Sequence, residues 1–197
     1  MSLTLSCDPH RSRTEAMATT TTLLDGVLPE FDFRSRHGRR VDAPPEWVAE
    51  AVDILRLGRA ASLLMRIRGL HIPPGSIRDV LTGSGFTVLA ERPGLEMVAG
   101  TNGQFWALRE QAHMEAPIDL QAFRAFDRPG WAQGAISLRI EPLEDGSTHD
   151  NTESRVRCVD DTARRRFAIY WLFIKGFSGW VRRDFLRRIA RMAEGVE

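Results

Sequence analysis

The sequence contains one lysine, Lys175, although 27 of its residues are basic. All the other basic residues are arginine, which indicates a general codon preference, so an arginine cluster is weaker evidence for phosphate recognition here than elsewhere. A phosphate-binding loop needs a Gly-Lys-Ser/Thr triplet after a glycine-rich turn, and Lys175 stands before Gly176 in the wrong context. The sequence therefore excludes this class of nucleotide site.

Cysteine is also scarce, and long apolar runs are absent. Cys7 lies in a polar tail and Cys158 ends a candidate strand, so we expect no framework disulfide and a reducing, cytoplasmic location. No run reaches about 18 apolar residues, so we expect no integral membrane segment. The formal net charge of +1 gives no overall attraction to polyanions, so nucleic-acid binding would require a local patch.

The 197 residues suffice for one domain with its own core. Residues 1–27 are rich in Ser and Thr and lack a sustained apolar run, which favours a disordered leader over a secretory signal. Residues 28–197 are then expected to form the domain. We find no internal repeat and no second domain in this range.

The first half of this domain is expected to contain one strand and two short helices. Residues 31–43 alternate apolar and charged side chains, as in a strand with one solvated face. Pro44 and Pro45 suit the opening turn of a helix. The apolar positions of this first helix are Trp47, Ala51, Ile54 and Leu55. A second helical segment is expected over 57–70, with Leu63, Leu64 and Ile67 on one side.

The second half reads as two hairpins and a long final helix. One hairpin turns at Pro93-Gly94, with a bulge or bend expected at Gly100 or Gly103, and a short helix begins after Asp119. The other hairpin turns at Asp145-Gly146. Strand alternation gives it two faces. One face holds Ile136, Leu138, Ile140, Thr152, Ser154 and Val156; the other holds Arg139, Glu141, Glu153 and Arg155.

The final helix combines large aromatic residues with many arginines. Asp160 and Asp161 are expected to cap its start. Apolar residues surround it almost completely from Arg164 to Lys175, which predicts burial, and a break is expected at 176–179 before an amphipathic end. Aromatic and basic residues fall mostly on different faces, which disfavours nucleic-acid binding. A peripheral membrane role is disfavoured because packing is expected to need the apolar arc. The alternative that the aromatics form a solid core stays open.

Several segments together resemble the START-like, or SRPBCC, helix-grip superfamily, over about residues 28–194. They are "VDAPPEWVAEAV", "AGTNGQFW", "FDRPGWAQGAISLRIEPL", "NTESRVRC" and "RRRFAIYWLFIKGFSGWVRR". The resemblance implies an α+β fold in which a curved antiparallel sheet wraps around a long C-terminal helix, with two short helices after the first strand. It also implies an apolar cavity between sheet and helix. None of these segments is a catalytic signature.

This resemblance leads us to expect binding of a hydrophobic or aromatic small molecule, lipid-like or polyketide-like, in the cavity. The expected ligand-binding residues are Trp106, Leu138, Thr152, Arg155, Phe167, Tyr170, Trp171 and Ile174. The alternative is an enzyme of the polyketide cyclase or dehydratase type, in which Tyr170, Thr152 or Arg155 polarises a carbonyl. Catalytic residues cannot be assigned from the sequence.

No cofactor is expected. Glu110 and His113 form a single Glu-x-x-His motif, whereas a di-iron site needs two such motifs and further carboxylates. No other histidine has a companion at metal-ligand spacing, so no metal site is predicted. We expect no nucleic-acid partner, and formation of a homodimer is left open.

Overall fold

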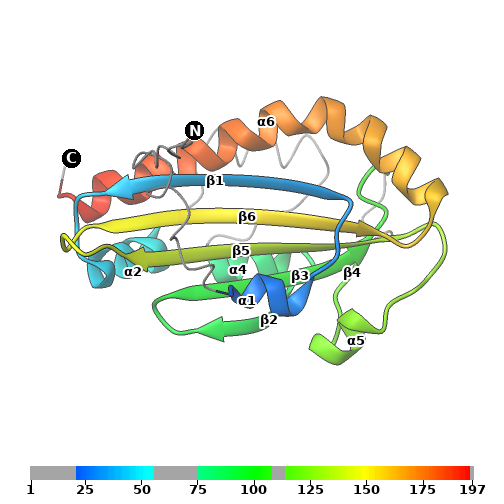
Figure 1. Cartoon of the computed structure of the whole chain (residues 1–197), viewed down its shortest axis with the longest axis horizontal. Helices are drawn as coiled ribbons and strands as arrows, with labels where there is room; N and C mark the ends of the chain where they lie inside the picture. Colours follow the sequence, from blue (N-terminus) through cyan, green and yellow to red (C-terminus); the bar gives the residue numbers. More distant parts are fainter. Residues whose placement is uncertain (1–20, 56–74, 108–113, 196–197) are drawn as a thin grey trace, which may run out of the picture.

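A six-stranded antiparallel sheet forms the centre of the structure (Figure 1). The computed structural model describes residues 21–55, 75–107 and 114–195. The strands are β1 (Phe33–Val41), β2 (Thr87–Arg92), β3 (Glu96–Gly103), β4 (Met114–Glu115), β5 (Ala132–Pro142) and β6 (Thr148–Cys158). The sheet order is β1-β6-β5-β3-β2, and β4 pairs with β3. The predicted α+β class with an antiparallel sheet is confirmed.

Helices cover both faces of this sheet. They are α1 (Leu23–Val27), α2 (Pro45–Ile54), α4 (Ile77–Gly83), α5 (Leu120–Arg124) and α6 (Asp161–Ala193). Side chains of α2, α4 and α6 pack with Leu138 and Ile140 of β5 on what we call the inner face. Side chains of α1 and α5 pack with Val98 and Ala135 on the outer face. The helix expected over 57–70 lies outside the described residues.

The hairpin of β5 and β6 has the predicted faces. Five residues connect the strands, Gly146 has a φ of 82°, and the Leu143 amide donates to the Ser147 carbonyl over 2.9 Å. Leu138 lies opposite Thr152 and Ile136 opposite Ser154, so these residues share the inner face. On the outer face, Arg139 pairs with Glu141 and Arg155 pairs with Glu153, each along its own strand. The pairing of these four charges across β5 and β6, which the shared face suggests, is therefore not observed.

The irregularity expected at Gly100 or Gly103 lies on the neighbouring strand. β3 is continuous, and the register of β2 shifts between Val88 and Ala90. A Cβ at Gly100 would stand 2.4 Å from Leu89 Cδ1 and 3.0 Å from a ring carbon of Phe123. Gly100 therefore makes room for two apolar side chains on the outer face, which alternation along β3 could not show.

Two short helices were not expected from the sequence. In α1, within the segment assigned to the leader, Thr22 and Asp25 form a capping box, and Leu24 and Val27 are buried. Ser76 and the third residue of α4 form another capping box. The Ser/Thr-x-x-Asp spacing of both boxes was the available signal.

Helix α2 begins at Pro45 as predicted, and of its four predicted apolar positions Ala51 and Leu55 are buried but Trp47 and Ile54 are not. Val48, Ala51 and Val52 face the core, whereas Trp47 and Ile54 are mostly exposed. Both expected and observed positions recur at helical spacing, because the segment has apolar residues on two sides. Periodicity alone did not select the buried side.

Helix α6 runs without a break through 33 residues, which corrects the predicted interruption at 176–179. The Asp160 carboxylate accepts from the Ala163 amide over 2.7 Å, which confirms its role as the cap. Gly176 is exposed, and Gly179 lies against the His37 ring of β1. A helix fixed by packing near both ends tolerates two internal glycines.

The apolar segment of α6 is not buried all round, which corrects a second prediction. Ile169 is 62% exposed, and Leu172 and Phe173 are each 79% exposed. The sheet covers one side of the helix, and no described helix covers the other side (Figure 1). The three apolar side chains that the sheet does not cover therefore form a solvent-facing surface.

Gly176→Ala is expected to stabilise the protein by about 1 kcal/mol, because alanine favours the helix and the added methyl meets no atom within 4 Å. The matched variant Gly179→Ala places its Cβ 3.3 Å from His37 Cε1, so its gain should be smaller or negative. Urea unfolding of both variants measures the difference. Destabilisation by Gly176→Ala would show that the helix breaks here in solution.

Candidate functional site: the inner face beneath α6

An aromatic cluster lies between the N-terminal part of α6 and the inner face. Phe167, the first large apolar side chain of α6, is 2% exposed and lies at its centre. Its ring centroid is 4.8 Å from that of Phe33 and 5.6 Å from that of Trp171, which stacks on it at 26°. Further rings around Phe167 belong to Phe105, Trp106 and Tyr170. Such a cluster provides a wall to which apolar rings and chains can bind.

Polar side chains occupy the middle of the inner face. On β1, Ser35 Oγ lies 3.2 Å from His37 Nε2. On β6, Thr152 is opposite His37 and Ser154 is opposite Ser35. Arg182 reaches down from α6, and its Nη2 donates to Ser154 Oγ over 3.0 Å. Two strands and the helix thus bring hydroxyl, imidazole and guanidinium groups together.

Several buried polar atoms on this face have no hydrogen-bond partner among the described residues. They include Nη1 of Arg182, both carboxylate oxygens of Asp150 and Oγ1 of Thr101. Asp150 is fully buried and follows the same alternation as Thr152 and Ser154 along β6. Buried polar groups in proteins are almost always paired, so such a concentration on one face needs an explanation.

Burial changes the acidity of these groups. It raises the pKa of Asp150 from 3.8 to about 7, so near neutral pH this carboxyl exists in both protonation states. It also lowers the pKa of Arg182 to about 10, which still leaves the guanidinium charged at neutral pH. The pKa of His37 is lowered by burial first and then by the positive charges of Arg182 and Arg183. The imidazole is therefore neutral under ordinary conditions.

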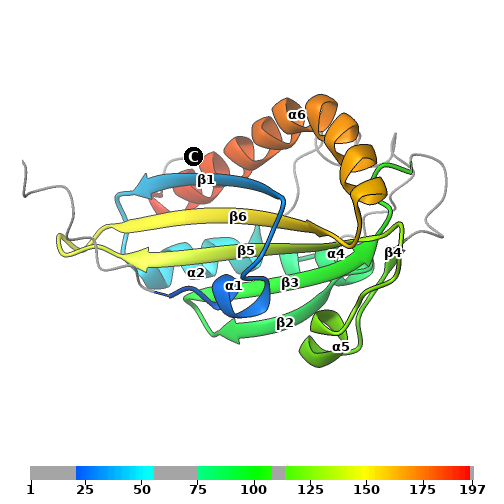
Figure 2. The same ribbon diagram turned by 45° about the vertical axis from the view of Figure 1, so that its right-hand side comes forward.

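The middle of α6 covers this face loosely. Phe167 near one end and Leu186 near the other are each 2% exposed, whereas Trp171, Ile174 and Arg182 between them are half-buried. Solvent also reaches Ile136 on the inner face, although β5 has neighbours on both sides. Figure 2 shows α6 arching over the β1 side of the sheet. The face is thus enclosed at both ends and less covered in the middle.

The structure brings most of the predicted site residues to this face. Trp106, Tyr170 and Trp171 all contact Phe167, and Leu138 and Thr152 lie opposite each other in the sheet. Ile174 is one helical turn beyond Trp171. Sequence reasoning did not select Asp150, Arg182 and His37. Asp150 follows the same strand alternation as Thr152, which was the available signal, but it stands beside the hairpin turn, where Asp is common for turn reasons.

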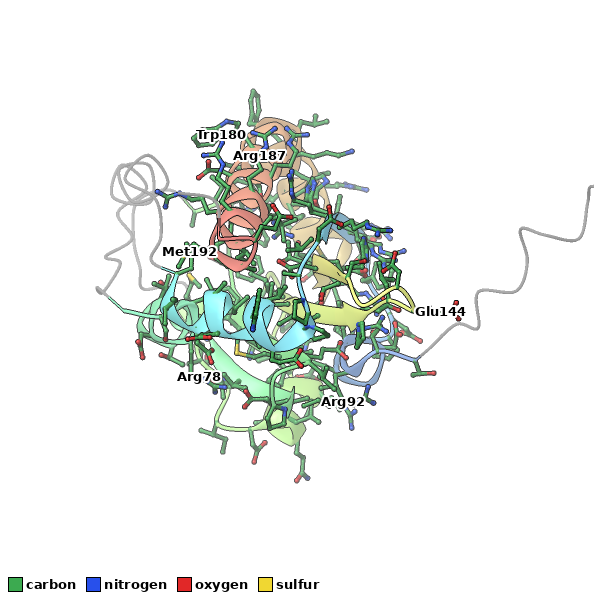
Figure 3. All side chains as sticks on the ribbon, turned by 90° about the vertical axis from the view of Figure 1, so that its left-hand side faces the viewer. Arg78, Arg92, Glu144, Trp180, Arg187 and Met192 are labelled. Carbon is green, nitrogen blue, oxygen red and sulfur yellow. The ribbon has the colours of Figure 1, made fainter. Side chains whose placement is uncertain are left out.

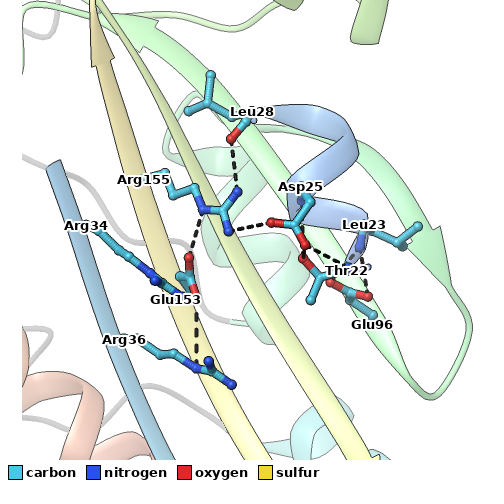
Figure 4. A network of polar contacts seen from close by, with 9 residues as sticks. All are labelled: Thr22, Leu23, Asp25, Leu28, Arg34, Arg36, Glu96, Glu153 and Arg155. Carbon is cyan, nitrogen blue, oxygen red and sulfur yellow. Dashed lines mark hydrogen bonds and ion pairs between the residues drawn. The ribbon is translucent and has the colours of Figure 1, made fainter. Parts of the chain in front are cut away.

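Arg155 does not join the other predicted site residues, because it points to the outer face (Figure 4). Its three nitrogen atoms bind Glu153 at 2.7 Å, the Leu28 carbonyl at 3.1 Å and Asp25 at 2.6 Å. Burial alone would raise the pKa of Asp25, but hydrogen bonds from Thr22 and Arg155 lower it to about 2. Arg155 thus fastens α1 to the sheet.

The remaining chemical candidates do not form a reactive centre. Glu110 and His113 lie outside the described residues. Burial, with the nearby negative charge of Asp32, raises the pKa of Cys158 to about 12, so its thiol is a poor nucleophile at neutral pH. Where the structure is described, no three His, Cys, Asp or Glu side chains gather to hold a metal ion, and none of its helices could span a membrane.

Comparison with known proteins gives only weak similarities. No family model matches the chain, and no curated protein matches it. Protein MLL2253 from Mesorhizobium loti is 13% identical, with a TM-score of 0.40, over 84% of this chain and 99% of its own. Protein CV1439 from Chromobacterium violaceum is 14% identical, with a TM-score of 0.38, over 83% of this chain and 99% of its own. Similarities at this level carry no argument about function.

Proposed function

We propose that the protein binds an amphipathic small molecule between α6 and the inner face of the sheet, in a helix-grip arrangement. The acidic group of the ligand would accept from Arg182, and its apolar body would lie against the aromatic cluster around Phe167. This proposal narrows the expectation of a lipid-like or polyketide-like ligand to one with a negative group.

The buried Nη1 of Arg182, which has no hydrogen-bond partner among the described residues, is the observation that carries the proposal. A buried charged group that lacks a hydrogen-bond partner costs several kcal/mol of stability, of order 2–5. We therefore expect a bound molecule to supply the missing partner. Nη2 of Arg182 already binds Ser154, and Nη1 has no partner among the described residues. A carboxylate, sulfonate or phosphate would supply that acceptor.

The neighbouring groups suit the rest of such a molecule. Ser154 and Thr152 offer hydroxyls beside Arg182, and the Asp150 carboxyl lies farther along β6. The spacing from Ser154 to Asp150 is about 13 Å along the strand, so Asp150 would meet a different part of the ligand. A hydroxyl or amine donor there would satisfy its oxygens.

The anionic dye 1-anilinonaphthalene-8-sulfonate tests this proposal, because it joins an aromatic body to one sulfonate. The native protein should bind it saturably, and Arg182→Met should weaken binding by about tenfold or more, the effect of one charge-assisted hydrogen bond. The matched control is Arg183→Met, which removes an equal charge from an exposed neighbouring position. Fluorescence titration measures both affinities.

Two outcomes would contradict the proposal. One is an absence of saturable dye binding to the native protein, and the other is an equal loss of affinity in Arg182→Met and Arg183→Met. Native mass spectrometry of the freshly purified protein adds an independent measurement, since a retained ligand appears as a defined mass increment that is reduced in Arg182→Met.

Asp150 supports the second candidate, an enzyme of the cyclase or dehydratase type. A carboxyl with a pKa of about 7 can accept a proton from a bound substrate and return it near neutral pH. Incubation of cell-extract metabolites with the native protein or with Asp150→Asn would separate the two functions. A new product mass formed only by the native protein favours the enzyme, and identical mass spectra favour binding alone.

A further inference from the structure

The outward side of α6 carries a straight row of exposed residues on the surface opposite the proposed ligand site. The residues recur every three or four positions, which places them on one helix face. They are Arg165, Ile169, Leu172, Gly176, Trp180, Arg183 and Arg187, with Phe173 beside them. In Figure 3, Trp180 and Arg187 are labelled on the side of α6 that faces away from the sheet. We call these eight residues the outer row.

The outer row has an apolar centre and basic ends. Ile169, Leu172, Phe173 and Trp180 form the centre, and arginines stand before and after them. From Arg165 to Arg187 the row is about 33 Å long. Exposed apolar side chains gathered on one helix face are unusual in a protein that has no partner for them.

Charge is distributed unevenly between α6 and the remainder of the chain. Helix α6 holds nine of the 27 basic residues but two of the 26 acidic ones. The helix is therefore net positive and the remainder net negative, although the whole chain has a net charge of +1. A negatively charged surface would attract the α6 side and repel the opposite side, which orients the protein before contact.

We infer that the outer row is a docking surface for an anionic phospholipid membrane, on which α6 lies flat. Arginines at both ends of the row contact lipid phosphates, while Leu172, Phe173 and Trp180 enter the boundary between headgroups and acyl chains. This inference does not rest on the proposed ligand, because the outer row and Arg182 lie on different sides of α6.

The composition of the outer row favours a membrane over other negative or apolar partners. A nucleic acid would contact the arginines but leave Ile169 and Leu172 in water, because bases stack on aromatic and not on aliphatic side chains. In a symmetric dimer packed through α6, the two net-positive helices would face each other and repel. A bilayer provides both the negative charge and the apolar phase.

Vesicle co-sedimentation of the full chain tests this inference. Vesicles of equal parts phosphatidylcholine and phosphatidylglycerol should retain the native protein, and pure phosphatidylcholine vesicles should retain much less. The double variant Leu172→Glu/Phe173→Glu should lower the partition coefficient at least about tenfold. Arg183→Glu/Arg187→Glu should also lower it and remove most of its dependence on salt. Both pairs are exposed, so the fold should persist, as circular dichroism can verify.

Helix α2 offers a matched control, because Trp47 and Ile54 are also exposed apolar residues but stand among the acids Glu46, Glu50 and Asp53. Trp47→Glu/Ile54→Glu should leave vesicle binding unchanged. An equal loss in the α2 variant would overturn the inference, and so would a native protein that stays in the supernatant. A dimer that dissociates in Leu172→Glu/Phe173→Glu, without vesicle binding, would assign the outer row to a second copy. Retention on single-stranded RNA, but not on vesicles, would assign it to nucleic acid.

Discussion

Asp150→Asn is expected to stabilise the protein by about 4 kcal/mol at pH 8 and by less than about 1 kcal/mol at pH 4. At pH 8 the native protein holds a charged carboxylate that is fully buried and lacks hydrogen-bond partners among the described residues. Asparagine keeps the size of the side chain and removes the charge. Urea unfolding at a series of pH values measures the difference.

The pH window follows from the pKa of Asp150 in the two states. Burial raises this pKa from 3.8 to about 7 in the folded protein, so between these values the folded state binds more protons than the unfolded state. Stability must then decrease as pH rises through this window and level off above it. Below pH 3.8 the carboxyl is protonated in both states and this contribution disappears.

Asp145 provides a control with the opposite sign. It is exposed at the tip of the β5–β6 hairpin, where hydrogen bonds from Ser147 and Arg40 lower its pKa to about 2. Asp145→Asn should therefore destabilise the protein slightly at neutral pH. This effect should fade as pH falls from 3.8 through the folded-state pKa of about 2. If Asp150→Asn instead behaves like Asp145→Asn, the Asp150 carboxylate has a hydrogen-bond or ion-pair partner in solution. The inner face then holds no unpaired carboxylate.

The sequence predicted the elements better than it predicted their exposed sides. Both hairpins, the start of α2 and the cap of α6 depend on local features such as Pro93-Gly94, Pro45 and Asp160, and all four predictions are confirmed. Burial depends on which helix surface meets the sheet, and that is not local information. Segments with apolar residues all around, as in α2 and α6, leave the choice of buried surface open.

Prediction of the candidate site shows the same division. Phe167, Tyr170 and Trp171 could be selected because the resemblance implies a final helix held against the sheet and because their helical spacing places them on one side of it. Arg182 could not be selected from an arginine-rich sequence, since nothing local distinguishes it from Arg183. The difference arises because α6 packs against β1 at Gly179, which turns Arg182 toward Ser154 and Arg183 toward solvent.

Arg155→Ala is expected to destabilise the protein by about 3–5 kcal/mol, because it leaves the buried Glu153 with less compensation and removes two of the hydrogen bonds that hold α1 and Leu28 to the sheet. The Arg155 guanidinium, 6% exposed, binds three separate oxygen acceptors and lies 4.6 Å from the ring centroid of Phe31. Arg155→Lys keeps the charge but cannot reach three acceptors at once, so it should recover less than half of the loss. Urea unfolding measures both variants.

Limited proteolysis gives a local readout of the same contact. Because α1 is joined to the sheet through Asp25 and the Leu28 carbonyl, Arg155→Ala should make the chain near Leu28 cleavable before the rest of the protein unfolds. The neighbouring variant Arg157→Ala, which loses one hydrogen bond to Gln133, should show neither effect. Asp25→Asn should increase cleavage at the same place but reduce the free energy of unfolding less, because the hydrogen bond between Arg155 and Glu153 remains. Equal stability of Arg155→Ala and the native protein would show that the other contacts of α1 suffice, namely its apolar contacts and the hydrogen bonds of Leu23 to Glu96 and of Arg124 to the Gly26 carbonyl.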